Sequence, residues 1–281
     1  MSTSHFVSID GVRTHYLESG TDHRGQRPTI LLLHSAEFGG AAELSWEFNI
    51  DALARHYHVV APDHLGFGRT DKIFDFNGQF NRRVEHIRRF IETLCLGPVH
   101  VMGSSMSGGL CLTVAARNNP DWPLRSVTCC SGGGDAPNNE ARKTLNTFDG
   151  SREHLRRIIE VMFLDPKWAK DEAYLDRRHA IATLPGAWEA TAAARFKAPF
   201  NDGSGDRRER DSIDYGKINV PVLVFAGRHD TLRAPGYTDG FVPKIPDCEL
   251  HMFEKAGHMG NIECADEFNT RVLKFLKRVD G

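Results

Sequence analysis

The stretch "VHVMGSSMSGGLCLTVAAR" (residues 99–117) decides how this chain folds. It begins as an apolar run typical of a buried strand, passes through a tight turn of Gly and Ser, and continues in a pattern typical of a helix. A serine on such a strained strand-to-helix turn is exposed for nucleophilic attack, and the small residues around it let strand and helix approach closely. The stretch therefore predicts a nucleophilic serine.

The spacing of the small residues selects which serine it is. Centred on Ser105, the residues two before and two after are Gly103 and Ser107, both small. Centred on Ser104, both flanking residues are methionines, which would clash. Ser107 itself lies too far into the helix. We therefore predict that Ser105 is the nucleophile.

A serine hydroxyl needs a base to remove its proton, and the base needs an acid to orient it. On a turn of this kind the partners follow in the order Ser, acid, His. Asp230 comes directly after the apolar run of residues 222–227, and His258 lies in a Gly-flanked loop after the last strand-like segment. His229 adjoins the acid but points to the opposite side in an extended chain, and His251 falls inside a strand. The sequence predicts Ser105, Asp230 and His258 as the catalytic set.

Acyl transfer also needs backbone N–H groups that bind the developing oxyanion. One donor should be the N–H of Met106, directly after the nucleophile. The other should come from "LLLHSAEFGG" (residues 31–40), where we predict Ala36. We expect His34 to brace this loop by hydrogen bonds rather than to titrate.

The composition is that of an ordinary globular protein. The chain has 281 residues, 40% of them hydrophobic, and a formal net charge of -2, which argues against nucleic-acid binding. The first twenty residues lack the apolar run of a signal peptide, and no stretch reaches the length of a membrane span. The six cysteines show no C-x-x-C spacing and favour free, mostly buried thiols. A cytoplasmic location with no membrane contact is expected.

Short apolar runs alternate with helical patterns, which predicts the α/β class with a mostly parallel sheet flanked by helices. We expect a hairpin turning at Asp10-Gly11. Further strands are expected at 29–34, 58–63, 99–104, 124–132, 220–227 and 248–254, with helices at 47–56, 80–95, 107–118 and 265–279.

Residues 133–213 break this alternation, because they contain helical patterns and no buried strand. We predict that they form a helical cap inserted into a core made of residues 1–132 and 214–281. The basic run "RRER" (207–210) near the end of the insertion is expected to be a solvated linker rather than a binding patch.

With these residues in place, the chain resembles the α/β-hydrolases over nearly its whole length. More narrowly, it resembles the meta-cleavage product hydrolases, which cut a C–C bond in vinylogous 1,5-diketones made by ring-opening dioxygenases. The resemblance is carried by "NIDALARHYHVVAPDHLGFGRTDK" (49–72), "GQFNRRVEHIRRFIETLCLG" (78–97), "GSSMSGG" (103–109), "GHMGNIECADEFN" (257–269) and the cap segment 152–182. It implies the α/β-hydrolase fold, with a helical cap insertion.

The resemblance also implies substrate-binding residues. A cap arginine of that family reaches the substrate's carboxylate and dienol end, and Arg178 is the matching position, with Arg177 beside it. Ser104 stands where an Asn is usual, Ser45 where another polar Asn is usual, and Met259 where a Trp is usual. The oxyanion loop departs too, since Glu37 and Phe38 replace the Gly and Pro of "HGxGPGA".

Two activities remain open from the sequence. The first is hydrolysis of a C–C bond in a vinylogous 1,5-diketone, and the second is an esterase, lactonase or amidase that uses the same residues through an acyl-enzyme. The altered oxyanion loop favours the second. Ser rather than Asp at position 105 excludes dehalogenase and epoxide-hydrolase chemistry, and an intact Ser–Asp–His set argues against a non-catalytic binding protein. The expected partner is a small-molecule substrate. No metal or organic cofactor is implied, and a homodimer is implied only by resemblance.

Overall fold

The computed structural model describes residues 2–75, 79–193, 195 and 213–281. Its centre is an eight-stranded sheet in the order β1-β2-β4-β3-β5-β6-β7-β8. The strands are β1 (Thr3–Ile9), β2 (Val12–Ser19), β3 (Thr29–Leu33), β4 (Val59–Pro62), β5 (Val99–Ser104), β6 (Leu124–Cys130), β7 (Val222–Gly227) and β8 (Cys248–Phe253). Pairing is antiparallel at β1–β2 and β2–β4 and parallel from β4 to β8. The predicted hairpin, strands and mostly parallel sheet are confirmed.

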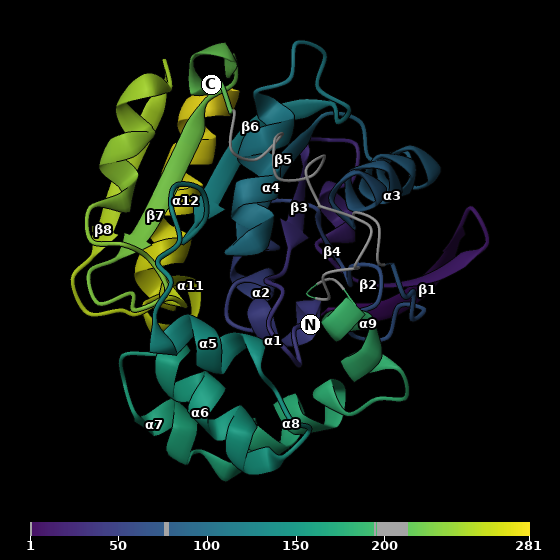
Figure 1. Cartoon of the computed structure of the whole chain (residues 1–281). Coiled ribbons are helices and arrows are strands. Elements are labelled where there is room, and N and C mark those ends of the chain that lie inside the picture. The colour runs from purple at the N-terminus through teal and green to yellow at the C-terminus, as the bar shows by residue number, and fades with distance from the viewer. Residues whose placement is uncertain (1, 76–78, 194, 196–212) are drawn as a thin grey trace, which may run out of the picture.

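Helices cover both faces of the sheet, because the central strands are apolar on both sides (Figure 1). In β3, Leu31 and Leu33 enter the core under α3 (Gln79–Thr93) and α4 (Met106–Ala115), while Ile30 and Leu32 enter the opposite core. That second core is closed by α1 (Ala42–Ser45), α2 (Ile50–Leu53) and α12 (Ala265–Asp280), with α11 (Gly260–Glu263) leading into α12. The chain thus forms helices, sheet and helices in three layers.

The helix predicted over 47–56 is wrong in its extent. Only α2 (Ile50–Leu53) forms there, preceded by turns and by α1. Asn49 is fully buried at the start of α2, and its amide donates to Asn261 O at 3.0 Å and to Asn269 Oδ1 at 2.9 Å. These tertiary hydrogen bonds anchor the start of α2 to α11 and α12.

Between β6 and β7 the described chain forms five α-helices, here called the inserted helices: α5 (Glu140–Asn146), α6 (Arg152–Met162), α7 (Lys167–Lys170), α8 (Glu172–Ala182) and α9 (Ala187–Ala193). The 3₁₀ helix η2 (Tyr215–Lys217) precedes β7. Asn139, Ser151 and Asp171 cap the N-termini of α5, α6 and α8 by accepting backbone N–H groups. The inserted helices share an apolar core with Phe38 and Met259. The predicted basic run at 207–210 lies outside the described residues, as does most of 194–212.

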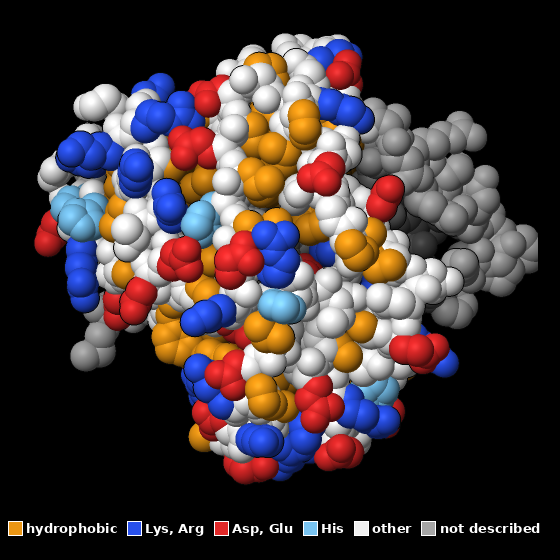
Figure 2. All heavy atoms as spheres, turned by 90° about the vertical axis from the view of Figure 1, so that its left-hand side faces the viewer, with side chains coloured by type: hydrophobic (Ala, Val, Ile, Leu, Met, Phe, Trp, Pro, Cys, Tyr) orange, Lys and Arg blue, Asp and Glu red, His pale blue; other side chains and the backbone are white. Residues whose placement is uncertain are grey.

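The inserted helices lie beyond the carboxyl ends of the parallel strands, the end to which the β7 and β8 arrows point in Figure 1. In open α/β sheets this is the end where ligands bind. On the face drawn in Figure 2, acidic and basic side chains are interspersed with hydrophobic ones. Among the described residues, no helix combines the length and the hydropathy that crossing a membrane requires.

Candidate active site

Ser105 occupies the turn between β5 and α4, with φ 55° and ψ −113°. This positive φ is strained for a residue with a side chain and is typical of functional turns. Two hydrogen bonds fix it, from Ser105 N to Cys130 O at 2.7 Å and from Gly109 N to Ser105 O at 3.2 Å. A Cβ on Gly103 would lie 2.3 Å from Ser107 O, so the close approach of strand and helix predicted from the sequence is confirmed.

A chain of hydrogen bonds joins three of the predicted site residues. His258 Nε2 lies 2.7 Å from Ser105 Oγ, and His258 Nδ1 lies 2.7 Å from Asp230 Oδ2. The carboxylate can only accept, so Nδ1 carries the proton and Nε2 accepts from the serine hydroxyl. The His258 and Asp230 side chains are only 3% and 2% exposed. This arrangement allows His258 to take the proton of Ser105 Oγ.

Asp230 is held as an anion by its neighbours. Burial alone would raise the pKa of its carboxyl, but its interaction with His258 and the N–H of Leu232 bring the pKa below its ordinary value. The two other histidines considered from the sequence are elsewhere, since His229 is exposed and His251 Nε2 donates to Glu267 Oε1 at 2.8 Å. The backbone N–H of His258 donates to Met162 O at 2.8 Å, and this bond helps to hold the histidine in place.

The hydroxyl of Ser107 joins the two segments that are predicted to form the oxyanion hole. The sequence indicates only that a small residue is needed at this position. Ser107 Oγ donates to His34 O at 2.5 Å, and it accepts from His64 Nε2 at 2.8 Å. His34 Nε2 in turn accepts from His64 N at 2.9 Å, so His34 braces its loop as predicted. Burial is the main cause that lowers the pKa of both histidines, that of His64 well below its ordinary value, so both are neutral. Met106 N opens α4 beside this network, and Ala36 lies two residues after His34.

The structure buries the three smaller predicted substrate-binding residues. Ser45, Ser104 and Met259 are each 0% exposed. Within the described part of the chain, the hydroxyls of Ser45 and Ser104 have no hydrogen-bond partner. Asn261, which the sequence analysis did not single out, donates to Ser45 O at 2.7 Å and links it to the loop that carries Met259. Only the folded structure reveals this link.

Arg178 is fully buried in α8 and is already paired. Its Nη1 donates to Glu37 Oε1 at 2.9 Å, and its Nε donates to Tyr174 Oη at 2.8 Å. Arg178 Nη2 and Glu37 Oε2 have no partner among the described residues. Burial would raise the pKa of Glu37, but Arg178 brings it below its ordinary value, so the carboxyl is charged. Leaving one partner of a buried pair unpaired costs about 3–5 kcal/mol.

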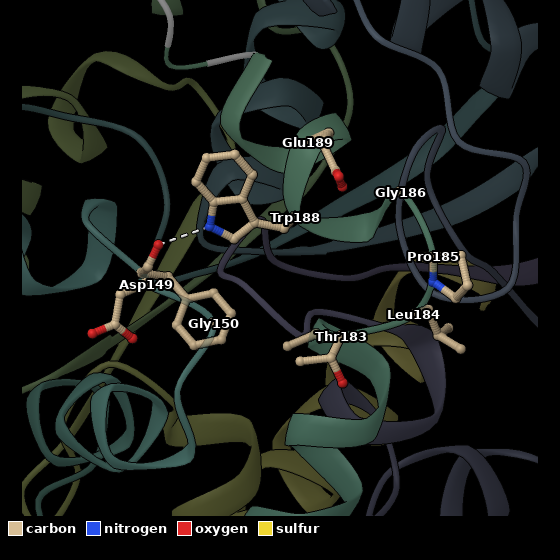
Figure 3. Close-up of a pocket in the computed structure, with 10 residues that line it drawn as sticks. Asp149, Gly150, Thr183, Leu184, Pro185, Gly186, Trp188 and Glu189 are labelled. Atoms are coloured by element: carbon tan, nitrogen blue, oxygen red, sulfur yellow. Dashed lines mark hydrogen bonds between the residues drawn. The ribbon is translucent and has the colours of Figure 1, made fainter.

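A cavity of about 320 Å³ lies among the inserted helices (Figure 3). It contains none of the predicted site residues and is lined by Phe148, Asp149, Gly150, Ala182, Thr183, Leu184, Pro185, Gly186, Trp188 and Glu189. Figure 3 shows the indole N–H of Trp188 bonded to the Phe148 carbonyl across one wall, at 2.8 Å. Phe148 also packs against Phe38 of the oxyanion loop, with ring centroids 5.0 Å apart. The cavity is therefore separate from Ser105, and one of its lining residues, Phe148, contacts the oxyanion loop.

A strand–Ser–helix turn at the carboxyl end of a parallel sheet, with an acid and a histidine after two later strands, defines a hydrolase of the α/β type. The family profile described as the alpha/beta hydrolase fold matches residues 28–265. This chain belongs to the α/β-hydrolase fold family.

Curated relatives make the comparison narrower. The 2-hydroxy-6-oxo-6-(2'-aminophenyl)hexa-2,4-dienoic acid hydrolase of Metapseudomonas resinovorans is 29% identical, with 97% of this chain and 90% of that protein covered. The 2-hydroxymuconate semialdehyde hydrolase of Pseudomonas sp. (strain CF600) is 28% identical, with 96% and 93% covered. A solved serine hydrolase involved in carbazole degradation is 27% identical with a TM-score of 0.79, and 99% of each chain is covered. The resemblance to meta-cleavage product hydrolases is confirmed.

Proposed function

We propose that this protein uses Ser105, His258 and Asp230 to hydrolyse a C–C bond in a vinylogous 1,5-diketone, a ring-fission product of aromatic degradation. One observation carries the proposal: the hydrogen-bonded chain Ser105–His258–Asp230, with both contacts at 2.7 Å, occurs in a chain whose full-length relatives are hydrolases of such compounds. The products are a dienoic acid and a second carboxylic acid.

The reaction begins with ketonisation of the dienol, which moves a proton from oxygen to carbon. Ser105 Oγ, or a water, then attacks the carbonyl carbon while its proton passes to His258 Nε2. The resulting oxyanion accepts the N–H groups of Ala36 and Met106. When the C–C bond breaks, its electron pair is delocalised through the conjugated chain onto the keto oxygen, which takes up a proton to give the hydroxydienoic acid. If Ser105 is the nucleophile, water then hydrolyses the acyl-serine through His258.

The remaining predicted residues would hold the substrate. Ser45, Ser104 and Met259 would surround the dienol, and Arg178 would reach the carboxylate end through Nη2, the guanidinium nitrogen without a partner in the described chain. Residues 133–213 would act as the cap over this space. A guanidinium suits an anionic dienolate because its donors are fixed in a plane.

A second candidate, an esterase, lactonase or amidase, is favoured by one specific contact. Glu37 already neutralises Arg178 at 2.9 Å, so a substrate carboxylate would have to share that cation with a buried carboxylate. A neutral ester or amide meets no such competition. The same three residues would catalyse its hydrolysis through an acyl-enzyme.

One pair of assays separates the candidates. Purified protein is mixed with a yellow dienol ring-fission product and, separately, with p-nitrophenyl esters, and the absorbance of each is followed. C–C hydrolysis requires rapid bleaching of the dienol that is lost in Ser105→Ala. Ester turnover with the dienol untouched would replace the first candidate by the second.

Two further proposals concern the protein as a whole. We expect a homodimer, by resemblance, and analytical ultracentrifugation checks it, since a single species at the mass of one chain contradicts it. We also propose a cytoplasmic location, which cell fractionation tests.

A further inference from the structure

Four consecutive residues of the oxyanion loop contact α8, the connection between α5 and α6, or Arg195. Ala36 O accepts from Arg195 Nη2 at 2.9 Å, and Glu37 accepts from Arg178 at 2.9 Å. The Phe38 ring packs on Phe148 at 5.0 Å. A Cβ on Gly39, which has φ +78°, would lie 2.8 Å from Arg178 O. This loop is therefore packed against the insertion along its length.

Among these contacts, the ion pair has the most fixed geometry. Tyr174 Oη accepts from Arg178 Nε one helical turn away, so α8 itself orients the guanidinium. Both charged side chains are buried, at 0% and 2% exposure, so water cannot substitute for either partner. The Phe38 contact is less constraining, because Phe148 also lines the 320 Å³ cavity.

A side chain of the core holds the start of the same loop. Ser107 Oγ donates to His34 O, two residues before Ala36. On the other side of Ala36 the next residue is Glu37, which pairs with Arg178 of the insertion. The backbone between these anchors carries the N–H that would bind the oxyanion. Such a donor acts only within about 2.7–3.1 Å of the oxyanion, and removing one donor costs about 10²–10³-fold in kcat.

We propose that Glu37 and Arg178 are positioning residues, whose buried ion pair holds the N–H of Ala36 at the oxyanion, so that the oxyanion hole is complete only while α8 packs on the loop. This inference rests on the proposed hydrolase function but not on the bond that is cut. It gives Arg178 a task that is independent of any charge on the substrate.

The experiment therefore uses a neutral substrate, p-nitrophenyl butyrate, on which a carboxylate-binding arginine has nothing to bind. Arg178→Met and Glu37→Gln are expected to lower kcat at least 30-fold, with KM changed less than threefold. Arg178→Lys, which keeps a cation facing Glu37, is expected to recover at least tenfold of the loss. A merely structural role would move thermal stability and the folded fraction without this split between kcat and KM.

The chain offers a matched control one residue away. Arg177 Nη1 donates to Glu47 Oε2 at 2.8 Å, so this pair also joins α8 to the core, but Arg177 is 54% exposed and the pair does not touch the oxyanion loop. Arg177→Met and Glu47→Gln are expected to keep kcat within twofold of the wild-type value.

Two outcomes would overturn the positioning role of Glu37 and Arg178, and a third separates it from the C–C proposal. Wild-type kcat on the ester in Arg178→Met overturns the proposal, whether or not turnover of a carboxylate-bearing dienol falls. An equal loss in the Arg177→Met control also overturns it, since general loosening of α8 would then explain the effect. If the wild-type protein leaves the dienol untouched but hydrolyses the ester, the C–C proposal fails while this test runs unchanged.

Discussion

Replacing Gly103 by alanine tests the geometry on which the choice of nucleophile depends. The new Cβ would lie 2.3 Å from Ser107 O, 2.4 Å from Ser107 C and 2.6 Å from Gly108 N, whereas ordinary contacts begin at 3.4 Å. All three atoms are backbone, so β5 and α4 must move apart by about 1 Å. Overpacking of this kind costs about 3 kcal/mol. At about 2–4 °C per kcal/mol, Tm should fall by about 6–12 °C.

Gly109→Ala is the matched control for this substitution. Gly109 lies in α4, the helix that Gly103 of β5 approaches. Its added Cβ would come no closer than 3.6 Å to its nearest neighbour, Gly133 N. Alanine is favoured over glycine inside a helix by up to about 1 kcal/mol, so Tm should stay equal or rise slightly. Circular dichroism melts of the three proteins give the comparison. If Gly103→Ala melts within 2 °C of Gly109→Ala, the close approach is not what selects Ser105.

Three more predictions follow from single contacts. Asp230→Asn should lower kcat about 10⁴-fold, because the acid holds His258 in its productive tautomer, and a loss below tenfold in steady-state assays argues against that role. The hydrogen bond from His15 brings the pKa of Asp63 below its ordinary value despite burial, so the ionised carboxylate stabilises the fold above about pH 4 and this stabilisation is lost as pH falls. Asp63→Asn should therefore weaken the pH dependence of the free energy of unfolding, measured with urea between about pH 5 and 3. An unchanged dependence of that free energy on pH contradicts this. With a thiol-reactive disulfide dye at pH 8, exposed Cys95 should react first, and Cys129, whose pKa burial raises to about 12, only on unfolding; rapid labelling of Cys129 would contradict its burial.

The convergence of Ser105, Asp230 and His258 could be predicted because each comes shortly after a strand of the sheet, β5, β7 and β8 respectively. Parallel strands end at one edge of the sheet, so residues just after them converge whatever their separation in sequence. The strands themselves were predictable from continuous apolar runs, which parallel pairing requires. Local pattern and topology were sufficient for this part of the site.

The contacts of Glu37 and Arg178 could not be predicted in the same way. The two residues are 141 positions apart, and their pairing depends on how α8 packs against a loop of the core. In the sequence Glu37 stands out as a departure from the family pattern and Arg178 as a candidate substrate-binding residue, but no periodicity links a loop to a helix that packs on it. Asn49 illustrates the same point, because it bonds to residues 212 and 220 positions later.

Ser107 shows how one residue can be predicted for one property and act through another. Its small size satisfies the register around Ser105, and glycine would satisfy it as well. Its hydroxyl does what glycine cannot, since it donates to His34 O at 2.5 Å and joins the nucleophile turn to the oxyanion loop. Ser107 on the core side and Arg178 on the insertion side then hold the segment on either side of Ala36. Both contacts act on the position of the Ala36 N–H, and neither involves Ser105, His258 or Asp230. A change in either contact should therefore reduce the rate of acyl transfer more than the affinity for substrate.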